Sequence, residues 1–155
     1  MAKFRSLMRW AMVSGPVVIQ AVQRYGPTIK HLIDSNPQAM DALTGKLRGY
    51  QNARKVSGVG GVEERIAVLR EQVNHLYASA NTPAVARQAQ EWRGQIDRIE
   101  TGLPLLDAMT AKARRRRTRE LGHKLDRISS KVLAAVVEDD VQDAEVLDET
   151  PRDGE

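Results

Sequence analysis

The fold of this chain is decided by residues 59–80, which read VGGVEERIAVLREQVNHLYASA. Small aliphatic and larger aliphatic residues recur there at alternating intervals of three and four, which is the spacing of one stripe along an α-helix that packs on a partner helix. The stripe consists of Val59, Val62, Ile66, Leu69, Val73, Leu76 and Ala80. Because charged and polar side chains take the other faces, we expect a coiled-coil-like helix over residues 62–80.

The partner helix is expected directly afterwards in the sequence. Asn81-Thr82-Pro83 combines capping side chains with a proline that suits the first helical position, and predicts a second helix over residues 83–101. A connection of two or three residues makes the two helices antiparallel. The predicted hairpin seam sets Val62, Ile66, Leu69, Val73 and Leu76 against Val85, Ala89, Trp92, Ile96 and Ile99. Closure of this seam within one chain is favoured, and a homodimer through a third helix is the alternative.

The third helix is expected over residues 104–137, after Gly102-Leu103-Pro104 ends the second. It carries two apolar stripes that are out of phase. The first consists of Leu106, Met109 and Ala113, and the second of Leu121, Leu125, Ile128, Val132 and Ala135. An arginine run separates them, and a core stripe cannot pass through it. The helix must therefore bend there, project free of the bundle or change partners.

The sequence predicts an all-α protein in four regions. Residues 1–56 form short basic helices, at 3–13, 16–25, 27–34 and 37–49, that are separated by Gly-Pro and Asn-Pro breaks. Residues 57–61 are a glycine-rich linker, residues 62–137 hold the hairpin and the third helix, and residues 138–155 are an acidic, disordered tail. No segment alternates in the manner of a strand.

Charge is divided unevenly along the chain. From Glu138 onward there are nine acidic residues and one basic residue, a net charge of −8, whereas residues 1–137 hold 23 basic and 11 acidic residues, a net charge of +12. A basic body attracts nucleic acid, anionic lipid or acidic protein. The chain has no cysteine, which excludes disulfides, thiolate metal sites and a cysteine nucleophile.

Patterns that carry catalysis are missing from the sequence. The three histidines, His31, His75 and His123, stand far apart and fit no metal-ligand spacing, and Gly45-Lys46 lacks the other residues of a phosphate-binding loop. We therefore expect a protein that is not an enzyme and that uses no cofactor and no metal ion.

Two basic surfaces are the candidate interaction sites. The first is an amphipathic amino-terminal helix, typical of contact with an anionic membrane or a protein partner, and its residues are Phe4, Leu7, Met8, Trp10, Lys3, Arg5 and Arg9. The second is the arginine run, whose guanidinium groups match phosphate oxygens, and its residues are Lys112, Arg114, Arg115, Arg116, Arg117 and Arg119. Alternatively, each surface is structural: the amino-terminal helix packs on the hairpin, and the run is solvated or paired with the chain's own tail.

The expected function is that of a cytoplasmic helical adaptor or scaffold, peripheral at the inner membrane face, with a protein or an anionic membrane surface as its partner. The alternative is a nucleic-acid-associated protein that binds phosphates through residues 112–119 and is masked by its acidic tail. The sequence leaves open whether the chain is a monomer or a homodimer.

Overall fold

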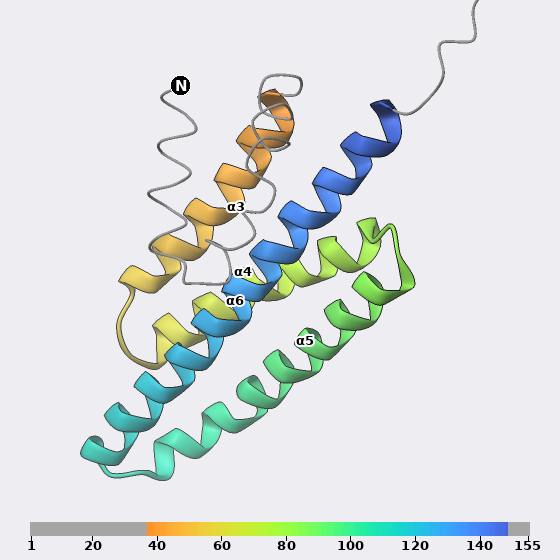
Figure 1. Ribbon diagram of the computed structural model, residues 1–155. Coiled ribbons are helices and arrows are strands. Elements are labelled where there is room, and N and C mark those ends of the chain that lie inside the picture. The colour runs from red at the N-terminus through yellow and green to blue at the C-terminus, as the bar shows by residue number, and fades with distance from the viewer. Residues whose placement is uncertain (1–36, 149–155) are drawn as a thin grey trace, which may run out of the picture.

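A computed structural model describes residues 37–148, with side chains from residue 48 to residue 139 and at positions 41 and 45. It contains α3 (Pro37–Lys55), α4 (Gly58–Ser79), α5 (Pro83–Gly102), the short 3-10 helix η1 (Leu103–Ala108) and α6 (Ala111–Asp148) (Figure 1). This range holds no strand, so the predicted all-α class is confirmed. The helices predicted at 3–13, 16–25 and 27–34 lie outside the described residues.

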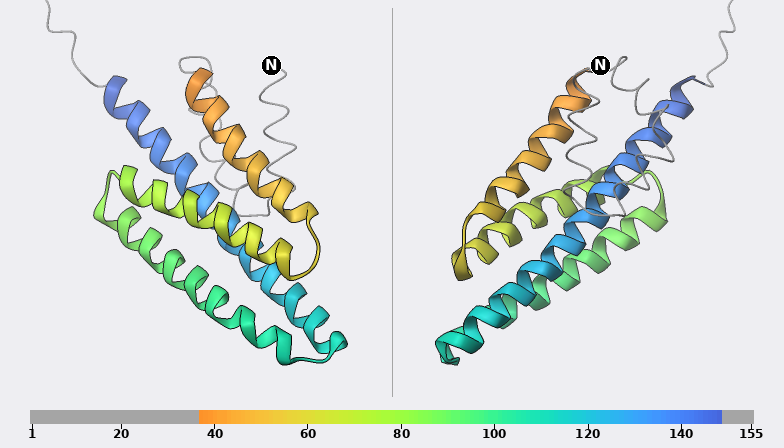
Figure 2. Two further views of the ribbon diagram at one scale, coloured as in Figure 1. Left: turned by 180° about the vertical axis from the view of Figure 1, so that it is seen from behind. Right: turned by 60° about the vertical axis from the view of Figure 1, so that its left-hand side comes forward.

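Helices α4 and α5 lie side by side and run in opposite directions (Figures 1 and 2). Nine of the ten predicted seam residues are buried, and the tenth, Val85, is half-buried. Thr82 caps α5, since its hydroxyl oxygen accepts a hydrogen bond of 3.3 Å from the backbone N–H of Val85. Three residues, 80–82, connect the two helices, a length typical of antiparallel neighbours.

A charged clamp joins α4 to α5 on their outer side. Arg70 on α4 donates hydrogen bonds of 3.1 and 2.6 Å to the two carboxylate oxygens of Glu100, and one of 2.7 Å to Asp97. The hydrogen bonds from Arg70 to Glu100 hold the pKa of Glu100 below its usual value. The clamp is exposed to solvent, so its main contribution is to the register of the two helices.

The third layer of the core comes from α6, which crosses the α4–α5 pair (Figure 2). Its buried stripe is Leu121, Leu125, Ile128 and Val132, and it shares one hydrophobic cluster with Leu103 and Leu106 of η1 and with Tyr50 of α3. The core is therefore built almost entirely from aliphatic side chains, as the scarcity of aromatic residues in the sequence requires.

The predicted start of the third helix is wrong. Residues 103–108 form η1, the backbone is extended at Met109, and α6 begins only at Ala111. Met109 and Ala113, predicted to be part of an apolar stripe facing the hairpin, are exposed. Since Leu106 belongs to a separate element, the two out-of-phase stripes need not share one helix. From Ala111, α6 continues without a break through the arginine run.

The linker and the tail are also more ordered than predicted. Helix α3 extends to Lys55 and α4 begins at Gly58, so only residues 56 and 57 connect them, and the glycines at 58, 60 and 61 form the first turn of a helix. The disorder predicted from Glu138 is wrong for residues 138–148, which continue α6. Asp139 is buried and accepts a hydrogen bond of 3.4 Å from the backbone N–H of Asn81, which ties this acidic segment to the α4–α5 connection. Residues 149–155 lie outside the described residues.

The tight turn between α3 and α4 requires glycine at two positions. Gly58 has a φ of +79°, a left-handed conformation that side chains disfavour. Gly61 lies so close to the carbonyl group of Val56 that a Cβ atom at this position would overlap the carbonyl oxygen. Gly60 has open space around the position of a Cβ atom.

The two neighbouring glycines should therefore respond to alanine in opposite ways. Gly61→Ala is expected to lower the free energy of unfolding by about 3 kcal/mol, because the backbone of the turn must move to relieve the overlap. Gly60→Ala should be neutral or raise it by up to about 1 kcal/mol, since alanine favours the helix. Urea denaturation followed by circular dichroism measures both changes. Equal effects of the two substitutions would contradict the close approach at Gly61.

Candidate anion-binding site

The first ten residues of α6 protrude beyond the core. None of residues 111–120 is buried, because the stripe that packs on the hairpin begins at Leu121. Local interactions support the helix there. The backbone N–H of Ala113 donates a hydrogen bond of 3.4 Å to the hydroxyl oxygen of Thr110, and Glu120 pairs with Arg116 at 3.2 Å and Arg117 at 3.0 Å. The two arginines lower the pKa of Glu120 from its usual value.

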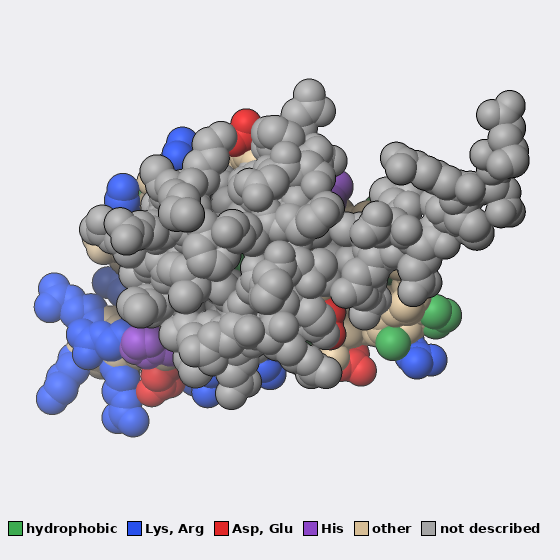
Figure 3. Space-filling model, turned by 45° about the horizontal axis from the view of Figure 1, so that its top comes forward, with side chains coloured by type: hydrophobic (Ala, Val, Ile, Leu, Met, Phe, Trp, Pro, Cys, Tyr) green, Lys and Arg blue, Asp and Glu red, His purple; other side chains and the backbone are tan. Residues whose placement is uncertain are grey.

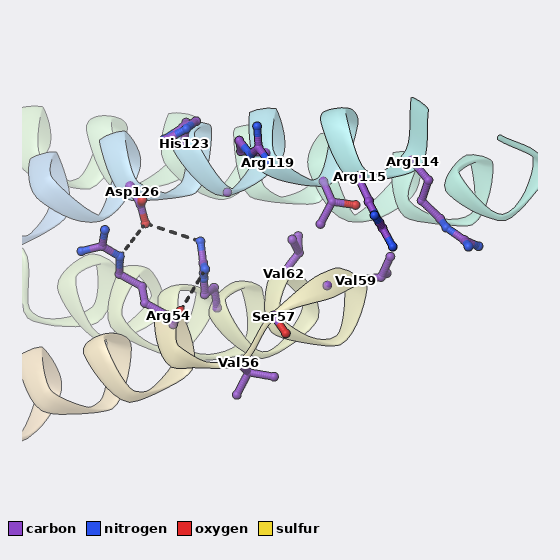
Figure 4. Close-up of a pocket in the computed structure, with 14 residues that line it drawn as sticks. Arg54, Val56, Ser57, Val59, Val62, Arg114, Arg115, Arg119, His123 and Asp126 are labelled. Carbon is purple, nitrogen blue, oxygen red and sulfur yellow. Dashed lines mark hydrogen bonds and ion pairs between the residues drawn. The ribbon is translucent and has the colours of Figure 1, made fainter. Parts of the chain in front are cut away.

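Arginines from three helices meet at this end of the molecule. A groove of about 540 Å³ lies where the α3–α4 turn faces α6, and five arginines line it, namely Arg54, Arg65, Arg114, Arg115 and Arg119. His123 and a single carboxylate, Asp126, are the other ionisable residues in its lining. In Figure 4, Arg115 extends from α6 toward Val59 on α4. Figure 3 shows a dense group of Lys and Arg side chains protruding at one end of the molecule.

Asp126 connects α6 to both α3 and α4 on one side of this groove. Its Oδ1 accepts a hydrogen bond of 2.9 Å from the Tyr50 hydroxyl and lies 3.4 Å from Arg54 Nε and 3.7 Å from Arg65 Nη1. Arg65 also donates from Nη2 to the backbone carbonyl of Arg54 at 3.2 Å. One carboxylate on α6 thus binds side chains from both α3 and α4 (Figure 4).

The Arg65 side chain lies in a confined space against α6. Its side chain is only 16% exposed, and its Nε is buried without a hydrogen-bond partner among the described residues. Gly122 leaves room for it, since a Cβ atom there would lie 2.9 Å from Arg65 Nη1. A guanidinium group that is largely buried, only partly neutralised by one carboxylate and placed beside four further arginines makes the groove attractive to an anion.

The structure brings together part of the predicted anion-binding set. Arg114, Arg115 and Arg119 line the groove, Arg116 and Arg117 instead pair with Glu120, and Lys112 is exposed near the start of α6. The candidate membrane face in residues 3–10 lies outside the described residues. Sequence reasoning missed Tyr50, Arg54, Arg65, His123 and Asp126. The available signal was the spacing Thr118, Gly122, Asp126, which marks a second, small and polar face of α6 beside its apolar stripe.

The acidic end of α6 is far from its arginine run. Arg119 and Asp148 are 29 residues apart on one continuous helix, a distance of about 44 Å. Residues 149–155 span at most about 25 Å when fully extended. Masking of the run by residues 138–155 of the same chain is therefore incompatible with the length of α6.

Comparisons of the chain with protein-family models, with curated proteins and with solved structures found no match. Within residues 37–148, no helix combines the length and hydrophobicity needed to cross a bilayer. The same part of the chain contains no group of three or more histidine, cysteine or acidic side chains placed to hold a metal ion.

The burial of Tyr50 and its hydrogen bond to Asp126 should make the stability of the protein depend on pH above pH 10. Burial, and then the charge of Asp126 and the hydrogen bond to it, raise the pKa of Tyr50 well above its ordinary value of 10, against the weaker opposing effect of Arg65 and Arg54. The unfolded state ionises near pH 10 whereas the folded state stays neutral, so this stabilisation is complete below pH 10 and decreases as the pH rises further.

We therefore expect the free energy of unfolding of the wild type to fall steeply between pH 9.5 and pH 11.5, and Tyr50→Phe to reduce that slope. Urea denaturation across this pH range measures it. Tyr77, which is exposed, supplies the control through Tyr77→Phe, which should leave the slope unchanged. The same slope in the wild type and in Tyr50→Phe would contradict the burial of a neutral phenol.

Proposed function

We propose that the protein is a non-enzymatic helical adaptor that docks on an anionic membrane surface through the exposed start of α6. The observation that carries this proposal is the groove in which Arg114, Arg115 and Arg119 join Arg54 and Arg65. A helical body that gathers five arginines around one groove suits the phosphate oxygens of lipid headgroups.

The placement of these charges supports a binding role because it is unfavourable for the helix itself. Lys112 and Arg114 occupy the first turn of α6, where the helix dipole is positive and the first turn contains no acidic residue. Each such charge costs about 0.3–1 kcal/mol of helix stability. The same arrangement adds the positive end of the dipole to the arginine charges, which strengthens the attraction for an anion at this end.

Exposed apolar side chains near the start of α6 favour a membrane over other polyanions. Leu105 is 66% exposed and Met109 is 37% exposed, and both line a groove with Arg117 on another side of α6 from Arg114, Arg115 and Arg119. Cationic and apolar side chains around one end of the molecule match the interface of an anionic bilayer, where headgroups and acyl chains are both within reach. The basic amphipathic segment with Phe4 and Trp10 would add a second anchoring contribution.

Charge reversal at the groove should remove binding to anionic vesicles. The triple variant Arg114→Glu, Arg115→Glu, Arg119→Glu is expected to weaken association with vesicles of phosphatidylserine and phosphatidylcholine by at least about 100-fold, since each basic residue near such a surface contributes about 1 kcal/mol. Co-sedimentation at increasing lipid concentration measures it. The matched control is Arg48→Glu, Arg87→Glu, Arg93→Glu, which makes the same change in net charge at exposed positions away from the groove. Equal losses in the two variants, or equal binding of the wild type to neutral vesicles, would contradict the proposal.

Nucleic acid is the second candidate partner, favoured by the density of arginines in residues 114–119. If about five phosphates are neutralised, the association constant should fall with salt concentration with a log–log slope near −4 to −5. A gel shift at several salt concentrations measures the slope.

The two exposed apolar residues distinguish the partners. Leu105→Ser with Met109→Ser should weaken vesicle binding by at least tenfold, because burial of a leucine side chain in an apolar medium contributes about 1.5–3 kcal/mol. The same variant should leave nucleic-acid binding unchanged, since phosphate contacts require no apolar group. Tight, salt-dependent binding to nucleic acid together with no binding to anionic vesicles would replace the membrane proposal with this one.

A further inference from the structure

Helix α6 carries opposite charges in its two halves. Residues 112–131 hold nine basic and two acidic residues, whereas residues 138–148 hold six acidic residues and no basic one. Because α6 is continuous, the acidic half cannot fold back on the arginine run of its own chain. A second copy of the chain meets no such limit.

A second groove, on another side of α6, is suited to an acidic helix. It has a volume of about 710 Å³ and lies between α5, η1 and the first half of α6. Five basic residues and no acidic residue are among its lining, and they are Arg98, Arg117, Lys124, Arg127 and Lys131. Its apolar lining includes the exposed Leu105 and Met109. An apolar floor with a purely cationic rim matches an amphipathic helix whose polar face is acidic.

Five charged positions of α6 recur at intervals of seven residues and so lie near one another on one side of the helix. Arg117, Lys124 and Lys131, all at the second groove, are seven residues apart and exposed, and the next two positions of the same heptad line are Glu138 and Glu145. When two such helices lie antiparallel and cross at Lys131, Arg117 meets residue 145 of the other copy and Lys124 meets residue 138. The two-fold axis repeats both pairs, so two pairs of opposite charge lie on each side of the crossing.

We propose that two copies of this chain pair antiparallel along α6, so that residues 138–148 of each copy lie in the second groove of the other. Four pairs of opposite charge then flank one pair of like charge, the two copies of Lys131 at the two-fold axis. In the sequence, Val141 lies one helical turn before Glu145 and is the aliphatic position nearest to the side of the incoming segment that carries Glu145. The acidic segment of each copy thus covers the basic groove of the other copy, and not a basic surface of its own chain.

Disulfide trapping tests the direction of the pairing. Because the chain has no native cysteine, any disulfide must form between the introduced residues. In the antiparallel register, Lys131→Cys should form a cross-linked dimer by itself under mild oxidation. Lys124→Cys and Glu138→Cys should each stay largely uncross-linked alone and form a heterodimer when mixed. Glu64→Cys, at an exposed position on α4, is the control for random collision. Cross-linking of Lys124→Cys with itself above the level of that control would overturn the antiparallel arrangement.

Sedimentation equilibrium tests the charge pattern. Lys124→Glu should raise the dissociation constant of the dimer at least tenfold, and Lys124→Glu with Glu138→Lys should restore it, because the pair is exchanged. Lys131→Gln should lower the dissociation constant, since it removes the like charges at the axis, whereas simple attraction of any acidic partner to the groove predicts a rise. A wild type that remains monomeric at 100 μM, or a double variant that is as weak as Lys124→Glu, would overturn the proposal. Lys124 and Lys131 lie outside the arginine run, so vesicle binding by these variants reports separately on the proposed function.

Discussion

The burial of one aliphatic stripe of α6 against the α4–α5 pair is the constraint on which the rest of the structure depends. The stripe starts at Leu121, and the ten residues before it contain no large aliphatic side chain. The hydrophobic effect therefore fixes the middle of α6 and leaves its first ten residues outside the core. A capping threonine, the pairs made by Glu120 and the good helix propensity of arginine keep those residues helical. The basic charge of the body is exposed at one end as a direct result.

The face of α6 beside that stripe is polar, and it links α6 to α3, which packs chiefly on α4. A carboxylate that is partly removed from water, as Asp126 is at 26% exposure, is unfavourable unless it is paired and hydrogen-bonded. Asp126 meets this condition only when Tyr50 and Arg54 of α3 and Arg65 of α4 are all in place. Such an arrangement adds little net stability compared with apolar packing but has strict geometric requirements. It aligns the α3–α4 turn with the start of α6, and the groove with its five arginines is the space between them.

The basic residues of α6 line two grooves, and each groove suits a different kind of partner. The first is formed by α3, α4 and α6, contains guanidinium groups close to the partly buried Asp126, and suits phosphate oxygens. The second is formed by α5, η1 and α6, combines an apolar floor with a cationic rim, and suits an acidic helix. A single continuous helix contributes to both because its basic residues are distributed around its whole circumference. A helix with its charges on one face alone would form only one of them.

The sequence by itself determined the helix class, the α4–α5 seam and the position of its connection, because a stripe with three-four spacing and an Asn-Thr-Pro signal are local patterns. It also identified the arginine run. It did not determine that α6 starts at Ala111, that residues 138–148 remain helical, or that Tyr50 and Asp126, 76 residues apart, form a hydrogen bond. Only the tertiary structure decided these features. They depend on which faces of distant helices come into contact, and a burial pattern read along one helix contains no information about the partner on its polar side.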